Sequence, residues 1–135
     1  MPINAPPRDA AFLPRELAVF PLSGAILLPR AELPLNIFEP RYLAMVEDAL
    51  RGDRIIGMVM IVPGHEEQYE GRPPIYPVGC AALITHVERL ADGRFNVILR
   101  GLDKFRIDEE EPPTDGVLYR IAHVTALEEV TTDAD

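Results

Sequence analysis

The sequence predicts a single mainly-β domain with one helix, folded as a small barrel or folded sheet. The chain has 135 residues, which is the usual size of one domain. Its 14 prolines disfavour a helical bundle, because proline lacks a backbone N–H and disrupts helix interiors. One segment shows helical spacing of apolar residues, whereas the other apolar segments have the length and pattern of strands.

The helix is predicted to begin at Pro40 and to end at Gly52. Proline suits a first helical turn, where its missing N–H would have no partner, and glycine commonly ends a helix in a left-handed conformation. Between them apolar side chains recur at three- and four-residue spacing: Tyr42, Leu43, Val46, Ala49 and Leu50. We expect Leu43, Val46 and Leu50 to be buried under the helix.

Two short strands are expected before the helix and four strands after it. The expected ranges are 16–20, 35–38, 55–62, 78–90, 94–107 and 117–125. The turn residues Ala91, Asp92 and Gly93 predict that the two long strands form a hairpin. Gly101, inside the second long strand, predicts a bulge or a bend there.

Charge is concentrated at the C-terminal end of the chain. The formal net charge is −9, and residues 108–135 carry one basic and nine acidic groups. The rest is nearly neutral, so the sequence lacks the basic footprint of a nucleic-acid-binding domain. We expect residues 1–15, rich in proline, to be a flexible lead-in, residues 16–127 to be the domain, and residues 128–135 to be an acidic tail.

The compartment and membrane expectations also follow from composition. No apolar run approaches the roughly 20 residues that a membrane-spanning helix needs, and the proline-rich start does not suit a signal peptide. The one cysteine, Cys80, excludes an internal disulfide. A cytoplasmic protein without membrane contact is therefore expected.

The sequence contains no recognisable metal, nucleotide or catalytic motif. Its histidines, His65, His86 and His123, are widely separated, so neither a metal nor another cofactor is expected. Cys80 and His86 would lie about 20 Å apart on one strand, too far for a thiolate–imidazole pair. A hydrolase that uses Cys80 with another histidine, or a carboxylate pair, remains an alternative.

The second long strand alternates polar and apolar residues, which predicts one outward basic face. Its members are Arg94, Asn96, Arg100, Lys104 and Arg106. This face is either solvated and paired with acids such as Glu88, or a contact surface for an acidic partner or for the acidic tail.

An apolar run interrupts the proline-bounded loop at residues 21–34. Ile26, Leu27 and Leu28 lie in a stretch that is too broken by proline to be a regular strand. The run either plugs the end of the barrel or forms an exposed interaction site. We predict polypeptide binding at these three residues, helped by unpaired edges of the early strands.

The residues also resemble a known family. LAVFPLSGAILLPRAELPLNIFEPRYLAMVEDAL resembles the opening of the Lon protease N-terminal (LON substrate-binding) domain. IIGMVMI, YPVGCAALITHVERLADGRFNVILRGLDKFRI and LYRIAHV are similar to its remaining strands, in the same order. The resemblance covers about residues 16–127 and implies a PUA-like six-stranded pseudo-barrel that recognises protein substrates.

The resemblance also bears on activity. The ATPase and protease domains of the full-length family have no counterpart in this sequence, so it implies a stand-alone or truncated form, with the acidic tail as the possible start of a helical subdomain. We therefore predict a non-enzymatic module that binds unfolded or exposed polypeptide segments, with no catalytic residues and no cofactor. RNA binding by analogy with other PUA-like barrels is a further alternative, and the oligomeric state is left open.

Overall fold

The computed structural model describes residues 13–23, 27–65, 67, 72–114 and 116–127. It contains six strands and one helix: β1 (Glu16–Leu22), β2 (Glu32–Ile37), α1 (Pro40–Leu50), β3 (Ile55–Met60), β4 (Val78–Arg89), β5 (Phe95–Glu110) and β6 (Arg120–Ala126). Most of the predicted lead-in and all of the predicted acidic tail lie outside the described residues.

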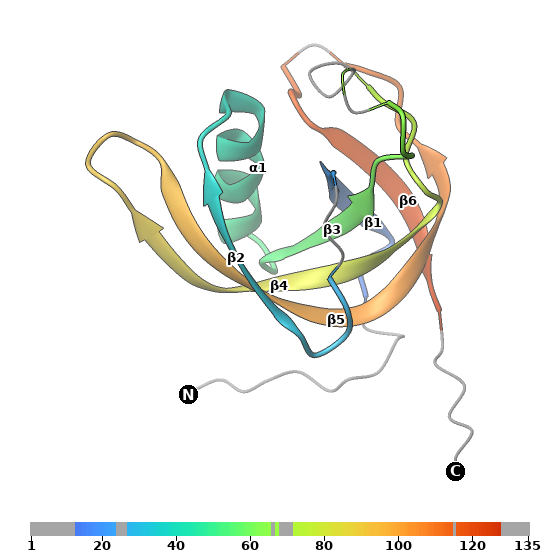
Figure 1. The fold of residues 1–135 in the computed structure, drawn as a ribbon, viewed down its shortest axis with the longest axis horizontal. Helices are drawn as coiled ribbons and strands as arrows, with labels where there is room; N and C mark the ends of the chain where they lie inside the picture. The colour runs from blue at the N-terminus through green and yellow to red at the C-terminus, as the bar shows by residue number, and fades with distance from the viewer. Residues whose placement is uncertain (1–12, 24–26, 66, 68–71, 115, 128–135) are drawn as a thin grey trace.

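The strands form one sheet that closes on itself. Their order is β2-β5-β4-β3-β1-β6, and β5 pairs with β6 as well, which closes a ring from which only β2 is left out. The β1–β3 pair is parallel and the other pairs are antiparallel. Figure 1 shows β4 and β5 as long curved strands that run beneath α1 in that view. The predicted mainly-β barrel with one helix is confirmed.

The helix covers the sheet with a slightly different stripe from the one predicted. Tyr42, Met45 and Val46 are buried, and the Tyr42 ring packs on Phe20 with ring centroids 4.4 Å apart. Val46 is buried as predicted. The expectation for Leu43 and Leu50 is wrong in degree: both are only half-buried and pack at the border of the core.

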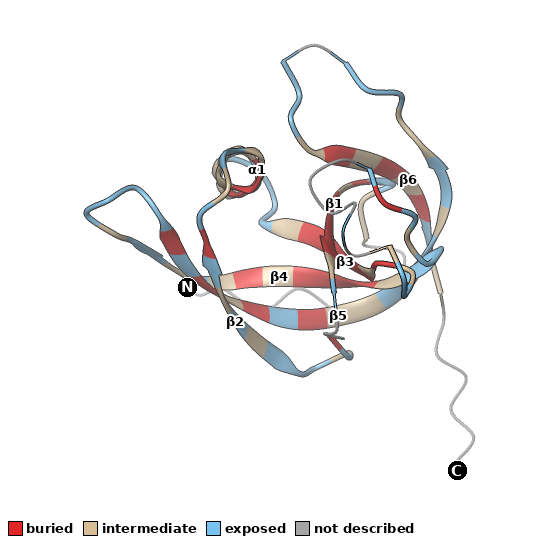
Figure 2. Cartoon of the chain, turned by 45° about the horizontal axis from the view of Figure 1, so that its top comes forward, coloured by how far each residue is buried: buried red, intermediate tan, exposed pale blue. Residues whose placement is uncertain are grey.

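The sheet separates two apolar clusters. The first, beneath α1, includes Phe20, Leu27, Met58, Cys80 and Leu99. The second lies on the other side of the sheet and includes Leu17, Val59, Ala81, Phe105 and Val124. Figure 2 shows the resulting alternation of buried and exposed residues along β5. The long strand β5 contributes residues to both clusters.

The bulge predicted at Gly101 is confirmed. Cys80 of β4 pairs with Lys104, and Ala82 pairs with Gly101, so β5 takes three steps where β4 takes two. An extra residue in one strand reverses which side of the sheet the following side chains occupy. The bulge therefore decides the direction of the side chains from Lys104 to Ile107, after which β5 has a second irregularity before Glu109.

This reversal divides the basic side chains of β5. Before the bulge Leu99 packs in the first cluster, so its neighbour Arg100 lies on the other side of the sheet. After the bulge Phe105 packs in the second cluster, so Lys104 lies on the side of the first. The prediction of one basic face is wrong: Arg94, Asn96 and Arg100 share one side, and Lys104 and Arg106 share the other.

Candidate functional site

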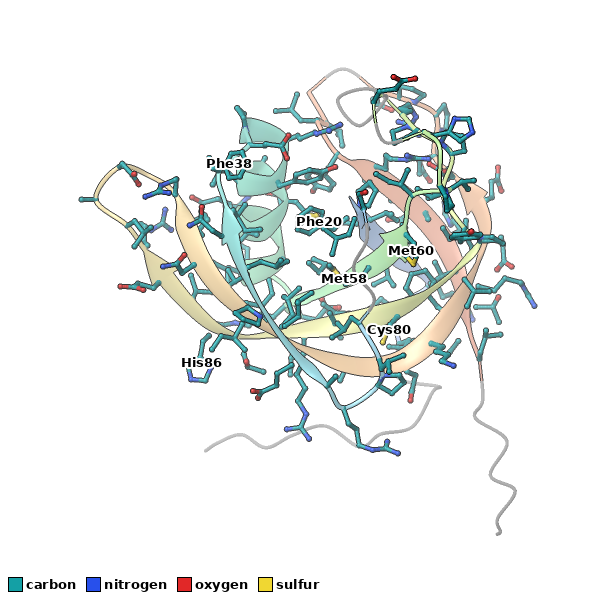
Figure 3. The ribbon with its side chains drawn as sticks, viewed as in Figure 1. Phe20, Phe38, Met58, Met60, Cys80 and His86 are labelled. Atoms are coloured by element: carbon teal, nitrogen blue, oxygen red, sulfur yellow. The ribbon has the colours of Figure 1, made fainter. Side chains whose placement is uncertain are left out.

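An apolar groove of about 410 Å³ opens on the side of the first cluster. It lies between the end of β1, the loop that follows it, β3, the start of β4 and the bulged part of β5. Its lining residues are Leu22, Leu27, Leu28, Met58, Val59, Met60, Tyr76, Pro77, Val78, Gly79, Cys80 and Lys104. Figure 3 labels Met58, Met60 and Cys80 in this part of the molecule.

Large apolar side chains are exposed at this groove. Leu28 is 56% exposed, Val78 is 44% exposed and Tyr76 is 40% exposed. Contiguous exposed apolar residues in a soluble domain mark interaction surfaces. The other large apolar residues with comparable exposure in the described part of the chain, among them Phe38 and Leu118, do not line the groove.

A second hollow, of about 430 Å³, lies on the outer face of β2, β4 and β5. Its lining includes three polar side chains, Asn36, Asn96 and Glu88. These side chains already satisfy one another: the Asn36 amide donates to Asn96 at 2.8 Å, and the Asn96 amide donates to Glu88 at 3.4 Å. We therefore place the candidate site at the apolar groove.

One wall of the groove is the loop at residues 27–31. Two backbone hydrogen bonds, which we call the strap, hold this loop against β5 at the bulge. The Arg30 N–H donates to the Gly101 carbonyl at 2.9 Å, and the Gly101 N–H donates to the Ala31 carbonyl at 2.8 Å. A Cβ at position 101 would lie 2.1 Å from the Leu28 carbonyl oxygen, so only glycine permits this approach. The strap holds Leu28 at the mouth of the groove.

The structure separates the three residues predicted to bind polypeptide. Leu27 is 6% exposed and belongs to the first cluster, whereas Leu28 is exposed beside the groove. Ile26 lies outside the described residues. The apolar run was expected either to plug the end of the barrel or to be exposed. The loop does both, because Leu27 packs in the core and Leu28 is exposed. Binding at these positions stays a prediction.

The opposite wall, which carries Tyr76 and Val78, is attached to β5 and β6 through a buried arginine, Arg120. Arg120 donates two hydrogen bonds to the Glu110 carboxylate, both at 2.9 Å, and a third at 2.8 Å to the Pro73 carbonyl. The Arg120 hydrogen bonds hold the pKa of Glu110 below its ordinary value, so the carboxylate stays charged. Bidentate pairs of this kind fix geometry, and here they fix the segment that leads into β4.

The same wall is joined to β3 by backbone contacts. The Tyr76 N–H donates to the Met60 carbonyl at 2.9 Å, and Ile61 forms a bridge with Ile75. Tyr76 and Val78 were not predicted from the sequence. An aromatic and a β-branched residue on either side of Pro77 were the available signal.

Cys80 lies at the floor of the groove and is buried. Its thiol contacts the carbonyl oxygens of Ala81 and Leu102, at 3.4 and 3.6 Å. The ring of His86 contacts Thr85, and the ring of His123 contacts Glu111. These contacts give the enzymatic alternative no support.

His123 of β6 lies close to two carboxylates at the place where β6 meets β1 and the end of β5, which we call the seam. Its Nε2 contacts the Glu111 carboxylate, which follows β5, and lies 3.6 Å from a Glu16 oxygen on β1. One atom from each residue lies within 4.8 Å of the others, which is a donor set that a divalent metal could use. The spacing of these residues along the chain gave no indication of this group. The hydrogen bond between the His123 ring and Glu111, with Glu16 close by, accounts for these contacts.

The seam should make stability depend on pH. The hydrogen bond with Glu111, aided by the charges of Glu16 and Glu109, raises the pKa of His123 above its ordinary value of 6.5. A raised pKa means that folding favours protonated His123, so this stabilisation is fully present below the ordinary value and is lost as the pH rises through the raised one. We expect the difference in Tm between wild type and His123→Gln to shrink between about pH 5 and pH 9. The variant His86→Gln, which changes an exposed histidine beside Thr85, is the control, and a constant wild-type advantage would contradict this role.

The comparisons with known proteins agree with this architecture. A family model for the "ATP-dependent protease La (LON) substrate-binding domain" matches residues 16–135. Among curated proteins, the chain is 30% identical over 122 residues to "Lon protease 2" of Myxococcus xanthus, and 33% identical over 103 residues to "Lon protease" of Flavobacterium johnsoniae. These matches cover 89% and 74% of this chain, but only 14% and 12% of the relatives.

Solved structures share the fold. A Lon N-terminal domain protein from Xanthomonas campestris is 29% identical with a TM-score of 0.67, and covers 87% of this chain and 63% of that one. The N-terminal domain of Mycobacterium avium complex Lon protease, at 21% identity and a TM-score of 0.64, covers 88% of this chain and 59% of that one, and shows the fold alone. The described residues include no helix with the length and apolar character needed to cross a bilayer. The chain belongs to the family of LON substrate-binding domains, as the sequence resemblance predicted.

Proposed function

We propose that this chain recognises protein substrates by binding apolar segments of unfolded or exposed polypeptide in the groove bordered by Leu28, Tyr76 and Val78. The observation that carries the proposal is the gathering of these exposed apolar side chains around one groove in a member of a substrate-binding family. Each square ångström of apolar surface that a segment buries there contributes about 25 cal/mol before the costs of association.

The lining suits partners of varied sequence. Met58 and Met60 supply unbranched, polarisable side chains that adapt to different shapes. Tyr76 adds a large surface with a polar tip. A groove of this composition favours apolar segments as a class over one fixed sequence.

The proposal assigns recognition to this chain and no catalysis. The chain corresponds to about a seventh of the Myxococcus xanthus relative, which is named as a protease. The groove offers hydrophobic contact and one lysine, and its only thiol contacts backbone carbonyls. We further place its action in the cytoplasm, without nucleic acid as partner, on the single free cysteine and the nearly neutral charge of residues 1–107.

Replacing Leu28 should weaken binding without unfolding the domain. We expect Leu28→Ser to raise the Kd for a fluorescently labelled, permanently unfolded client about tenfold, because a large apolar contact is lost. The Tm should stay within about 2 °C of wild type, since surface substitutions usually change stability by less than 0.5 kcal/mol. Fluorescence anisotropy and thermal melting measure the two quantities.

Leu118→Ser provides the matched control. Leu118 is 58% exposed, against 56% for Leu28, and does not line the groove. It should leave the Kd unchanged. Equal effects of the two variants on binding would remove the groove from the proposal.

A further inference from the structure

Among the described residues, a single charged side chain lines the apolar groove. That side chain is Lys104, and none of the described lining residues carries a carboxylate. Lys104 is exposed at the surface of the groove. A segment that enters the groove therefore meets apolar walls and one positive charge.

Two other basic residues near the ends of β5 have carboxylate partners. Arg94 pairs with Asp92 at 2.7 Å, and Arg106 pairs with Asp108 at 2.9 Å. The ion pairs between described residues include none for Lys104. Its charge is thus not neutralised by a carboxylate within the described part of the chain.

The bulge at Gly101 is what directs this charge to the groove. Lys104 pairs directly with Cys80, which lies on the groove floor, and directly paired residues share one side of a sheet. With unbroken alternation, Lys104 would lie with Arg100 on the opposite side of the sheet. The backbone thus places a cation where an alternating strand would have excluded it.

We propose that the groove selects apolar segments that carry an aspartate or glutamate next to the apolar anchor, and disfavours those flanked by lysine or arginine. This inference rests on the proposed function and adds a charge preference to it. A carboxylate beside the anchor forms an ion pair with Lys104, whereas a cation is repelled by it. Because Lys104 is exposed, the preference should be about two- to fivefold in Kd and should weaken with salt.

Three labelled peptides test the preference with the full chain. They share a central Leu-Phe-Leu anchor and carry two aspartates, two asparagines or two lysines at identical flanking positions. Anisotropy titrations at about 20 mM and 300 mM salt give the Kd of each, and ion pairing predicts a larger spread at low salt. The variants are Lys104→Gln, Lys104→Glu and, as a matched control on the other side of β5, Arg100→Gln.

The expected order of affinity for wild type is aspartate, then asparagine, then lysine. Lys104→Gln should remove the order, Lys104→Glu should reverse it, and Arg100→Gln should keep it. Equal binding of the three peptides by wild type, or an unchanged order in Lys104→Gln, overturns the charge preference while the proposed function stands. If wild type binds none of the peptides and no unfolded client, the proposed function itself fails.

Discussion

Leu27→Ser, in the loop that follows β1, is expected to lower the free energy of unfolding by about 3–5 kcal/mol. Leu27 is 6% exposed and packs in the cluster beneath α1, so serine leaves a cavity and places a hydroxyl in apolar surroundings. Urea denaturation followed by circular dichroism measures the loss.

Two companion variants isolate the cause of that loss. Leu27→Met nearly conserves volume and apolar character, and should cost less than about 1.5 kcal/mol. Leu28→Ser makes the same chemical change one residue later, where the side chain is 56% exposed, and should leave stability close to wild type. If Leu27→Ser cost no more than Leu28→Ser, Leu27 would not be the plug that its burial indicates.

These adjacent leucines show where sequence reasoning reaches its limit. The apolar run was evident, but an irregular loop has no period that tells which side chain points inward. The hydrogen bonds between the loop and Gly101 set the directions of Leu27 and Leu28. Gly101 lies about 70 positions further along the chain. Such a contact is not encoded in local spacing.

Features with local causes were predicted well. Pro40 begins the helix, and the turn after it starts at Arg51, one residue before the predicted glycine. The hairpin between β4 and β5 forms with Gly93 at a φ of 93°, as its turn residues predicted. In these cases the conformational preference of one residue decides the outcome.

Features that depend on distant pairing were not predicted. We expected the early strands to leave open edges, yet β1 lies inside the ring between β3 and β6, and only β2 keeps a side without a strand partner in the described sheet. Likewise, the groove combines Leu28 with Tyr76 and Val78, which are separated by about 50 residues of sequence. Gly101 indicated the bulge, but only the cross-strand pairing shows that it places Lys104 on the side of the groove.

Gly101→Ala should damage stability and binding together, because this glycine connects the bulge to the groove. The added Cβ would lie 2.1 Å from the Leu28 carbonyl oxygen and 2.9 Å from its carbon, which are backbone atoms of the loop. The loop must therefore move, and overpacking of this kind costs about 1–3 kcal/mol.

The displacement also acts on function, since the moving segment carries Leu28 and lies against the bulge that orients Lys104. We expect the Kd for an unfolded client to rise at least as far as in Leu28→Ser, although both lining side chains are retained. Hydrogen exchange should show faster exchange of the Arg30 amide, which donates to the Gly101 carbonyl. Gly52→Ala is the matched control, because its added Cβ would meet no atom closer than 3.9 Å. A Gly101→Ala protein with faster Arg30 exchange and unchanged affinity would show that binding does not depend on the loop, and the groove would lose its first wall.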